Sequence, residues 1–178
     1  MLVNFCGAPG SGKTTMMAGA FFELKAAGWD VETISEASKE KIYEKDLFSL
    51  SDEILIFAEK YRRVLRLAGT DIKLTDTSLR QSAYYAEGKF GPIGEQFFRN
   101  VADGFDNIYI IVDRVHPYIP KGRMQDPSDA DKAGVEIISD IMSSGSPVIT
   151  VDGHRTSLEA IIAFITEQAQ LRGLASAA

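Results

Sequence analysis

The sequence predicts an α/β fold in which a five-stranded, mainly parallel sheet carries helices on both of its faces. Short apolar runs of strand character alternate along the chain with longer segments whose apolar residues recur at helical spacing. A glycine-rich segment, residues 7–14, separates the first apolar run from the first helical segment. The 178 residues, 45% hydrophobic and 25% charged, are typical of a globular chain that can bury one core.

The glycine-rich segment reads GAPGSGKT and fits the phosphate-binding pattern G-x-x-x-x-G-K-[ST]. Glycines let successive backbone N–H groups turn toward a polyphosphate, and the helix that follows aims its positive end at the same anion. Lys13 is expected to reach the outer phosphates, and the Thr14 hydroxyl to bind Mg²⁺. The residues predicted to bind the donor, ATP, are Gly7, Gly10, Ser11, Gly12, Lys13, Thr14 and Thr15. A chance glycine-rich turn is the alternative, which the flanking strand and helix disfavour, so we predict a P-loop NTPase fold.

The first helix is expected to end near Ala27, before Gly28, and residues 31–34 alternate like a strand. This strand delivers Glu36 to its carboxyl end, where ligands bind in open parallel sheets. Glu36 is therefore a candidate base that accepts the proton of an acceptor hydroxyl. A solvent-facing glutamate that caps the next helix is the alternative. The charged stretch 39–50 is irregular, and a helix followed by a loop is one interpretation of it.

A second long helix is predicted to start at 51–53 and to end before Gly69. Its apolar stripe consists of Ile54, Phe57, Tyr61, Val64 and Ala68. Three arginines lie off this stripe, namely Arg62, Arg63 and Arg66. Because the guanidinium group suits phosphates and carboxylates, they are candidates for binding an anionic acceptor; a solvated face is the alternative.

Residues 71–75 predict the next strand, and Asp76 follows it at the edge where the phosphate loop is expected. A carboxylate in that position holds the magnesium ion, directly or through water. Capping of the helical stretch 79–86 is the alternative for Asp76, although Thr77 or Ser78 suits that role. Tyr84 and Tyr85 then provide aromatic rings that can stack on a base of the acceptor.

Residues 107–112 form a nearly continuous apolar run, as expected for a central strand of a parallel sheet, and 113–114 read Asp-Arg. Residues 115–125 contain two prolines and a glycine, so the segment from about 114 to 127 is predicted to be a loop. Its four potential cations are Arg114, His116, Lys121 and Arg123. We interpret it as a cationic lid in which Arg123 contacts the transferring phosphoryl group, Lys121 the acceptor and Arg114 the donor. A plain exposed loop is the alternative.

The last part of the chain predicts a helix that begins near Ser128, a strand at 147–151 and a final helix that buries Ile161 and Ile165. The loop after this strand is expected near the adenine of the donor, which makes His154 a candidate contact. Residues 1–173 are predicted to form a single domain, and residues 174–178 a frayed tail.

The formal net charge of −6 argues against broad affinity for nucleic acids. Residues 60–123 nevertheless hold 11 basic and 7 acidic side chains, so an anionic acceptor is expected to meet the middle of the chain. No apolar run reaches membrane length and the N-terminus lacks a signal-peptide pattern, so a cytoplasmic protein without membrane contact is expected. No feature of the sequence sets an oligomeric state.

The order of these elements resembles the P-loop kinases of small molecules, and more closely a phage-encoded P-loop kinase family related to ribosylnicotinamide kinases and to nucleoside and deoxynucleoside monophosphate kinases. The resemblance rests on residues 3–13, 75–78, 82–85, 113–114, 122–125 and 151–153. It implies transfer of the γ-phosphate of ATP to a hydroxyl, with Glu36 as base, Asp76 near magnesium and Arg123 on the lid. Where this pattern usually has an arginine after the acidic residue, this chain has Thr77 and Ser78.

Some members of this family are implicated in phosphorylating 5-hydroxymethyluracil within DNA. The resemblance therefore implies a nucleotide-type acceptor, with 5-hydroxymethyluracil in phage DNA as the most specific candidate and the host cytoplasm as the location. A deoxynucleoside monophosphate or a nucleoside is the alternative acceptor. A motor or switch ATPase and a nucleotide-binding subunit without chemistry are the competing classes. The missing carboxylate directly after Asp76 disfavours the former, and retention of Lys13, Thr14 and Asp76 disfavours the latter.

Overall fold

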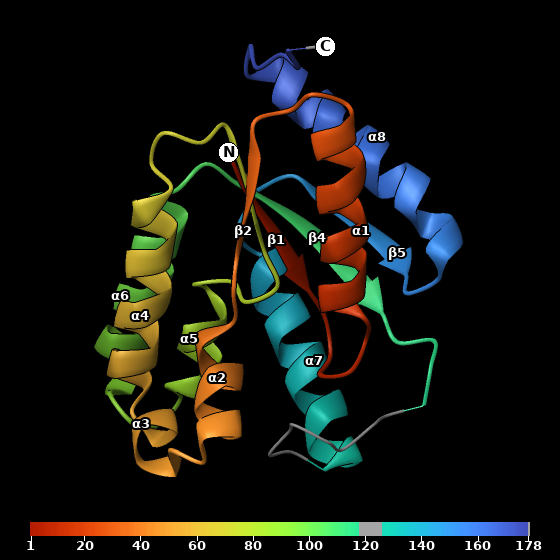
Figure 1. Cartoon of the computed structure of the whole chain (residues 1–178). Helices are drawn as coiled ribbons and strands as arrows, with labels where there is room; N and C mark the ends of the chain where they lie inside the picture. Colours follow the sequence, from red (N-terminus) through yellow and green to blue (C-terminus); the bar gives the residue numbers. More distant parts are fainter. Residues whose placement is uncertain (118–125, 178) are drawn as a thin grey trace.

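The computed structural model describes residues 1–117 and 126–177, and a five-stranded sheet forms its centre (Figure 1). Its strands are β1 (Leu2–Cys6), β2 (Val31–Ile34), β3 (Ile72–Thr75), β4 (Asn107–Asp113) and β5 (Val148–Asp152). They are arranged in the order β2-β3-β1-β4-β5, and every described pair of neighbours is parallel. The predicted α/β class is confirmed, and the sheet is parallel throughout.

Helices cover both faces of the sheet (Figure 1). On one face lie α1 (Lys13–Ala26) and α8 (Leu158–Leu171), which follows a short 3₁₀ helix at Arg155–Ser157. On the other face lie α4 (Glu53–Arg66), α5 (Gln81–Tyr85), α6 (Gly91–Asp103) and α7 (Pro127–Met142). Two short helices, α2 (Ala37–Glu44) and α3 (Leu47–Ser51), follow the carboxyl end of β2.

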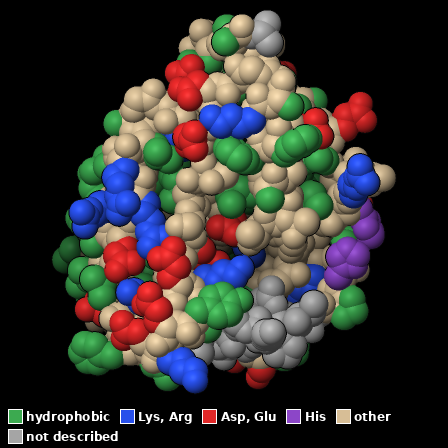
Figure 2. Space-filling view, viewed as in Figure 1, with side chains coloured by type: hydrophobic (Ala, Val, Ile, Leu, Met, Phe, Trp, Pro, Cys, Tyr) green, Lys and Arg blue, Asp and Glu red, His purple; other side chains and the backbone are tan. Residues whose placement is uncertain are grey.

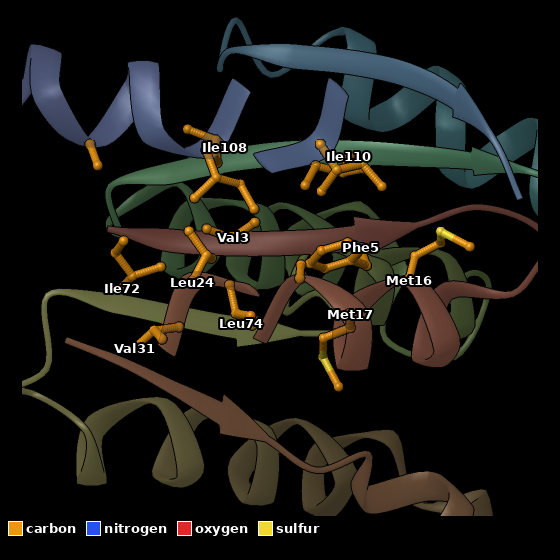
Figure 3. Close-up of a cluster of buried hydrophobic side chains, with 14 of the residues drawn as sticks. Val3, Phe5, Met16, Met17, Leu24, Val31, Ile72, Leu74, Ile108 and Ile110 are labelled. Atoms are coloured by element: carbon orange, nitrogen blue, oxygen red, sulfur yellow. The ribbon is translucent and has the colours of Figure 1, made fainter. Parts of the chain in front are cut away.

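The core follows the two-residue period of the strands, because successive side chains point to opposite faces. Val3 and Phe5 of β1 are fully buried in the layer shared with Leu24 of α1, together with Ile108 and Ile110 of β4 (Figure 3). The alternate residues of β1, such as Leu2 and Cys6, are buried against the helices of the opposite face. Strands buried on both faces explain why the sequence shows continuous apolar runs.

Three local expectations were wrong in part or in full. In the stretch 39–50 the expected helix is present as most of α2, but most of α3 stands where a loop was expected. The buried stripe of α4 consists of Glu53, Ile56, Phe57, Lys60 and Val64, whereas Ile54 and Tyr61 are exposed. Helix α7 is capped by Asp126, whose side chain accepts a hydrogen bond from the backbone N–H of Asp129, and not by Ser128.

The strand order decides which loops meet. Strand β1 lies between β3 and β4, and β2 lies on the outer side of β3. Because all strands are parallel, the segments after β1, β3 and β2 leave the same edge of the sheet side by side. This edge therefore collects the phosphate loop, Asp76 and Glu36 in one place. None of the helices within residues 1–117 and 126–177 combines the length and the hydropathy that a membrane span requires.

Candidate active site

The loop of residues 7–12 is packed tightly against the ends of β4 and β5. Gly7, Gly10 and Gly12 have φ angles of +135°, +85° and +95°, which residues with a Cβ rarely adopt. A Cβ on Gly7 would lie 2.4 Å from the carbonyl oxygen of Val112, and one on Gly153 would lie 2.7 Å from that of Ser11. Gly7 is therefore required both by the backbone conformation and by the lack of space, Gly10 and Gly12 by the conformation, and Gly153 by the lack of space.

The interior of this loop has the properties of an anion site. Helix α1 begins at Lys13 directly after Gly12, and no side chain caps its first N–H groups. The hydroxyl of Ser11 is buried and has no hydrogen-bond partner among the described residues. The ammonium group of Lys13 folds back over the loop and donates to the carbonyl oxygens of Gly7, at 3.1 Å, and Ala8, at 2.9 Å. A polyphosphate would supply acceptors for all of these donors.

Thr14 and Asp76 face one another across the same edge. The Thr14 hydroxyl donates a hydrogen bond to Oδ2 of Asp76, which joins the first turn of α1 to the residue after β3. Asp76 is almost completely buried, and α5 begins only at Gln81, so Asp76 does not cap that helix. A hydroxyl and a carboxylate are hard oxygen ligands that suit Mg²⁺, an ion that takes its remaining ligands from water and phosphate. No group of three or more His, Cys, Asp or Glu side chains in residues 1–117 and 126–177 could hold a metal.

Glu36 stands at the N-cap position of α2, yet its side chain makes no capping hydrogen bond. Instead it lines a cleft of about 420 Å³ that also contains Thr14 and Asp76. Burial raises the pKa of the Glu36 carboxyl above its usual value, and the negative charge of Asp76 acts in the same direction. Lys13 and Lys60 lower this pKa, but they do not outweigh burial. The cleft thus begins at the candidate phosphate and metal site and holds a proton-accepting group on its wall.

Of the three arginines on α4, Arg63 reaches the rim of this cleft. One terminal nitrogen, Nη1, donates to the Ser35 carbonyl at 3.0 Å, to the Ser35 hydroxyl at 2.7 Å and to Glu40 at 2.9 Å. The other, Nη2, donates to Glu40 at 2.5 Å. Arg62 and Arg66 are exposed on α4.

The other predicted contacts are distributed around this site. Tyr84 and Tyr85 form an edge-to-face pair with ring centroids 5.0 Å apart, and both pack partly buried against the cluster that contains Ile137 of α7. Thr15 is exposed in the first turn of α1. Lys121 and Arg123 lie outside the described residues.

Two predicted donor contacts lie on the β4–β5 side of the phosphate loop. Arg114 donates to the carbonyl oxygen of Pro9 at 2.7 Å and to Asp131 of α7 at 2.6 Å, so it ties the loop to that helix. His154 follows Gly153, which contacts the loop, and its ring lies edge-on to that of His116 at 5.7 Å. The pairing of the two histidines was not expected.

Sequence reasoning missed a buried polar group between α4 and α5. The Lys60 ammonium donates to the Ser82 hydroxyl at 3.2 Å and lies 4.0 Å from Oε1 of Glu53. Burial lowers the pKa of Lys60 and raises that of Glu53. The signal was available, because residues 53, 57, 60 and 64 share one face of a helix and two of them are charged.

Comparisons with known proteins agree with this geometry at the level of the fold. Neither the protein-family models nor the curated protein sequences contain a match to this chain. Among solved structures, a crystal structure of NadR protein in complex with NR is similar, with a TM-score of 0.70 and 17% sequence identity. The likeness covers 99% of this chain and 53% of that one, so the chain spans about half the length of this neighbour. The P-loop NTPase fold that the sequence predicts is therefore confirmed.

Proposed function

We propose that this protein is an ATP-dependent kinase that transfers the γ-phosphate to a hydroxyl of a nucleotide-type acceptor. One observation carries the proposal. The cleft of about 420 Å³ starts at Thr14 and Asp76 and has the carboxylate of Glu36 on its wall. A hydrolytic motor needs room only for water, whereas this cleft has the size of a site for a small molecule.

In this reaction Glu36, Lys13 and the N–H groups of the phosphate loop each have a role. The acceptor oxygen attacks the γ-phosphorus, the bond from that phosphorus to the β,γ-bridging oxygen breaks, and ADP leaves. Glu36 takes the proton of the acceptor hydroxyl and passes it to solvent. Its raised pKa supports this role, because a base works best when its pKa approaches the working pH. Lys13 and the N–H groups of the loop hold the phosphates in position.

Thr14 and Asp76 would hold magnesium, which when bound neutralises part of the charge of the phosphates. The most specific candidate acceptor is 5-hydroxymethyluracil in DNA, and deoxynucleoside monophosphates and nucleosides are the other candidates. A structural neighbour was solved in complex with NR, which supports adding NR to the compounds offered.

The test is transfer of labelled γ-phosphate from ATP to nucleosides, NR, mononucleotides and DNA with or without 5-hydroxymethyluracil. We expect label in an acceptor, lost in Lys13→Ala and reduced by a factor of about 10² to 10⁴ in Glu36→Gln. Glu44→Gln is the matched control, because Glu44 is an exposed carboxylate at the end of the same helix, α2. Hydrolysis of ATP with no label in any acceptor would contradict the kinase and favour the motor or switch ATPase.

A further inference from the structure

The charges on the wall of the acceptor cleft are mainly negative. Among the described residues, three carboxylates line it, those of Glu36, Glu40 and Asp76, against one ammonium group, that of Lys39. Figure 2 shows this face hollowed near its middle, with acidic side chains gathered beside the hollow over α2 and α4. The phosphates of the donor would add further negative charge at the inner end. A second anion in this cleft therefore meets repulsion.

The arginine that reaches the cleft is already occupied. Both terminal nitrogens of Arg63 donate hydrogen bonds to the carboxylate of Glu40, and Nη1 also donates to Ser35. The two-point contact with the carboxylate fixes the plane of the guanidinium group. Glu40 is itself a wall residue, so one of the cleft's own carboxylates holds this cation. To bind a phosphate of the acceptor, Arg63 would have to leave Glu40.

Three other cations in the described part of segment 60–123 are engaged away from the cleft. Arg80 is buried and pairs with Asp103 at 2.5 Å and with Asp140 at 2.6 Å, between α6 and α7. Arg99 pairs with Asp140 at 2.8 Å. Lys60 is buried beside Ser82 and Glu53. Part of the positive charge of this segment is thus used for internal ion pairs.

We propose that the acceptor is a small molecule without a phosphate group, of the nucleoside class, and that a nucleoside monophosphate or a DNA strand is disfavoured. This inference rests on the proposed kinase function and decides among its acceptors. Carboxylates and hydroxyls such as those of Glu36, Glu40 and Thr33 accept hydrogen bonds from sugar hydroxyls. The ring of Tyr43, which also lines the cleft, provides a flat surface for a base.

The experiment uses pairs of acceptors that share at least one free hydroxyl and differ by one phosphate. One pair is a 2′-deoxynucleoside and its 3′-monophosphate, which share the 5′-hydroxyl. Another is 5-hydroxymethyl-2′-deoxyuridine and its 5′-monophosphate, which share the hydroxymethyl group. We expect kcat/KM to be about tenfold or more higher for the member without phosphate, because a phosphate brings close to two negative charges at pH 7.

Glu40→Gln tests the cause of this preference. The amide can still accept hydrogen bonds from Arg63, but it removes one negative charge and releases the guanidinium from its ion pair. We expect kcat/KM for the phosphorylated member to rise about tenfold relative to its partner, with no such change in the control Glu44→Gln. Arg63→Met should lower kcat/KM by the same factor for both acceptors of a pair, because Arg63 does not contact the acceptor's phosphate.

The outcomes separate the two proposals. A higher kcat/KM of the wild type for the phosphorylated acceptor would overturn this inference and leave the proposed kinase function intact. The same holds for a loss of kcat/KM in Arg63→Met that is confined to the phosphorylated acceptor. An unchanged preference in Glu40→Gln would also overturn it, because the charge of the wall would then not set the selectivity. Transfer to no acceptor, with ATP still hydrolysed, would overturn the kinase itself and this inference with it.

Discussion

The Thr14 hydroxyl donates a hydrogen bond to the carboxylate of Asp76 and so connects the first turn of α1 to the residue after β3, 62 residues further along the chain. The contact follows from the topology, because β1 and β3 are parallel neighbours and their carboxyl ends lie at the same edge. It places a hydroxyl and a carboxylate next to the phosphate loop before any ligand is bound. The candidate metal ligands are therefore preorganised by the sheet itself.

Asp76→Asn tests whether this carboxylate serves the metal. The amide oxygen can still accept from Thr14, so the fold should persist, but the negative charge is lost. We expect the Mg²⁺ concentration for half-maximal transfer to rise about tenfold and the rate to fall about 100-fold. A Mg²⁺ titration of the transfer assay measures both, and Asp71→Asn, the same change at the opposite end of β3, is the control. An unaltered Mg²⁺ dependence would remove Asp76 from the metal site.

Gly7→Ala tests the packing of the phosphate loop. Its Cβ would lie 2.4 Å from the Val112 carbonyl oxygen, at a φ of +135° that alanine rarely adopts. We expect a loss of about 2–4 kcal/mol in the free energy of unfolding, together with weaker ATP binding. Urea denaturation and ATP titration measure the two effects. Gly69→Ala, where a Cβ meets nothing within 4 Å, should change neither; a Gly7→Ala protein as stable as this control would contradict the tight contact.

Glu36→Gln gives a prediction about stability that does not depend on the reaction. Burial raises the pKa of Glu36, so the folded state holds this proton more tightly than the unfolded chain. The stability that this group contributes is complete below the ordinary carboxyl pKa, about 4.3, and is lost as the pH rises through the raised value. Glutamine does not titrate, so the variant should be more stable than the wild type at pH 7, by a margin that shrinks toward pH 4.

Urea unfolding at a series of pH values, without nucleotide or metal, measures this margin. Glu44→Gln replaces an exposed carboxylate on the same helix and should leave the free energy of unfolding within about 0.5 kcal/mol of the wild type. A Glu36→Gln protein that is less stable than the wild type at pH 7 would mean that the carboxylate is held by favourable contacts in the folded state. Glu36 would then lose the property that supports its role as a base.

The sequence was most informative where local rules decide the structure. The glycines in residues 7–14 determine the backbone conformation of the phosphate loop, and Asp76 and Glu36 each follow a predicted parallel strand. The loop and the two carboxylates could therefore be placed at one edge of the sheet. The role of Arg63 could not be predicted, since its partners Ser35 and Glu40 are 28 and 23 residues away in the chain. Helical periodicity also gave the wrong stripe for α4, because it counts apolar residues and here the buried face includes Glu53 and Lys60.

That buried pair gives the last prediction. Lys60 and Glu53 lie 4.0 Å apart with almost no exposure, and Oε1 of Glu53 has no hydrogen-bond partner among the described residues. Replacing one partner leaves a buried charge without its counter-ion, so Lys60→Met should cost about 3–5 kcal/mol of unfolding free energy. The double variant Lys60→Met/Glu53→Leu removes both charges and should be more stable than Lys60→Met alone. Lys25→Met breaks the exposed pair with Glu32 and should have little effect. Urea denaturation of the wild type, Lys60→Met, Glu53→Leu and the double variant measures the coupling, and losses that add up in the double variant would show that the two charges do not stabilise one another.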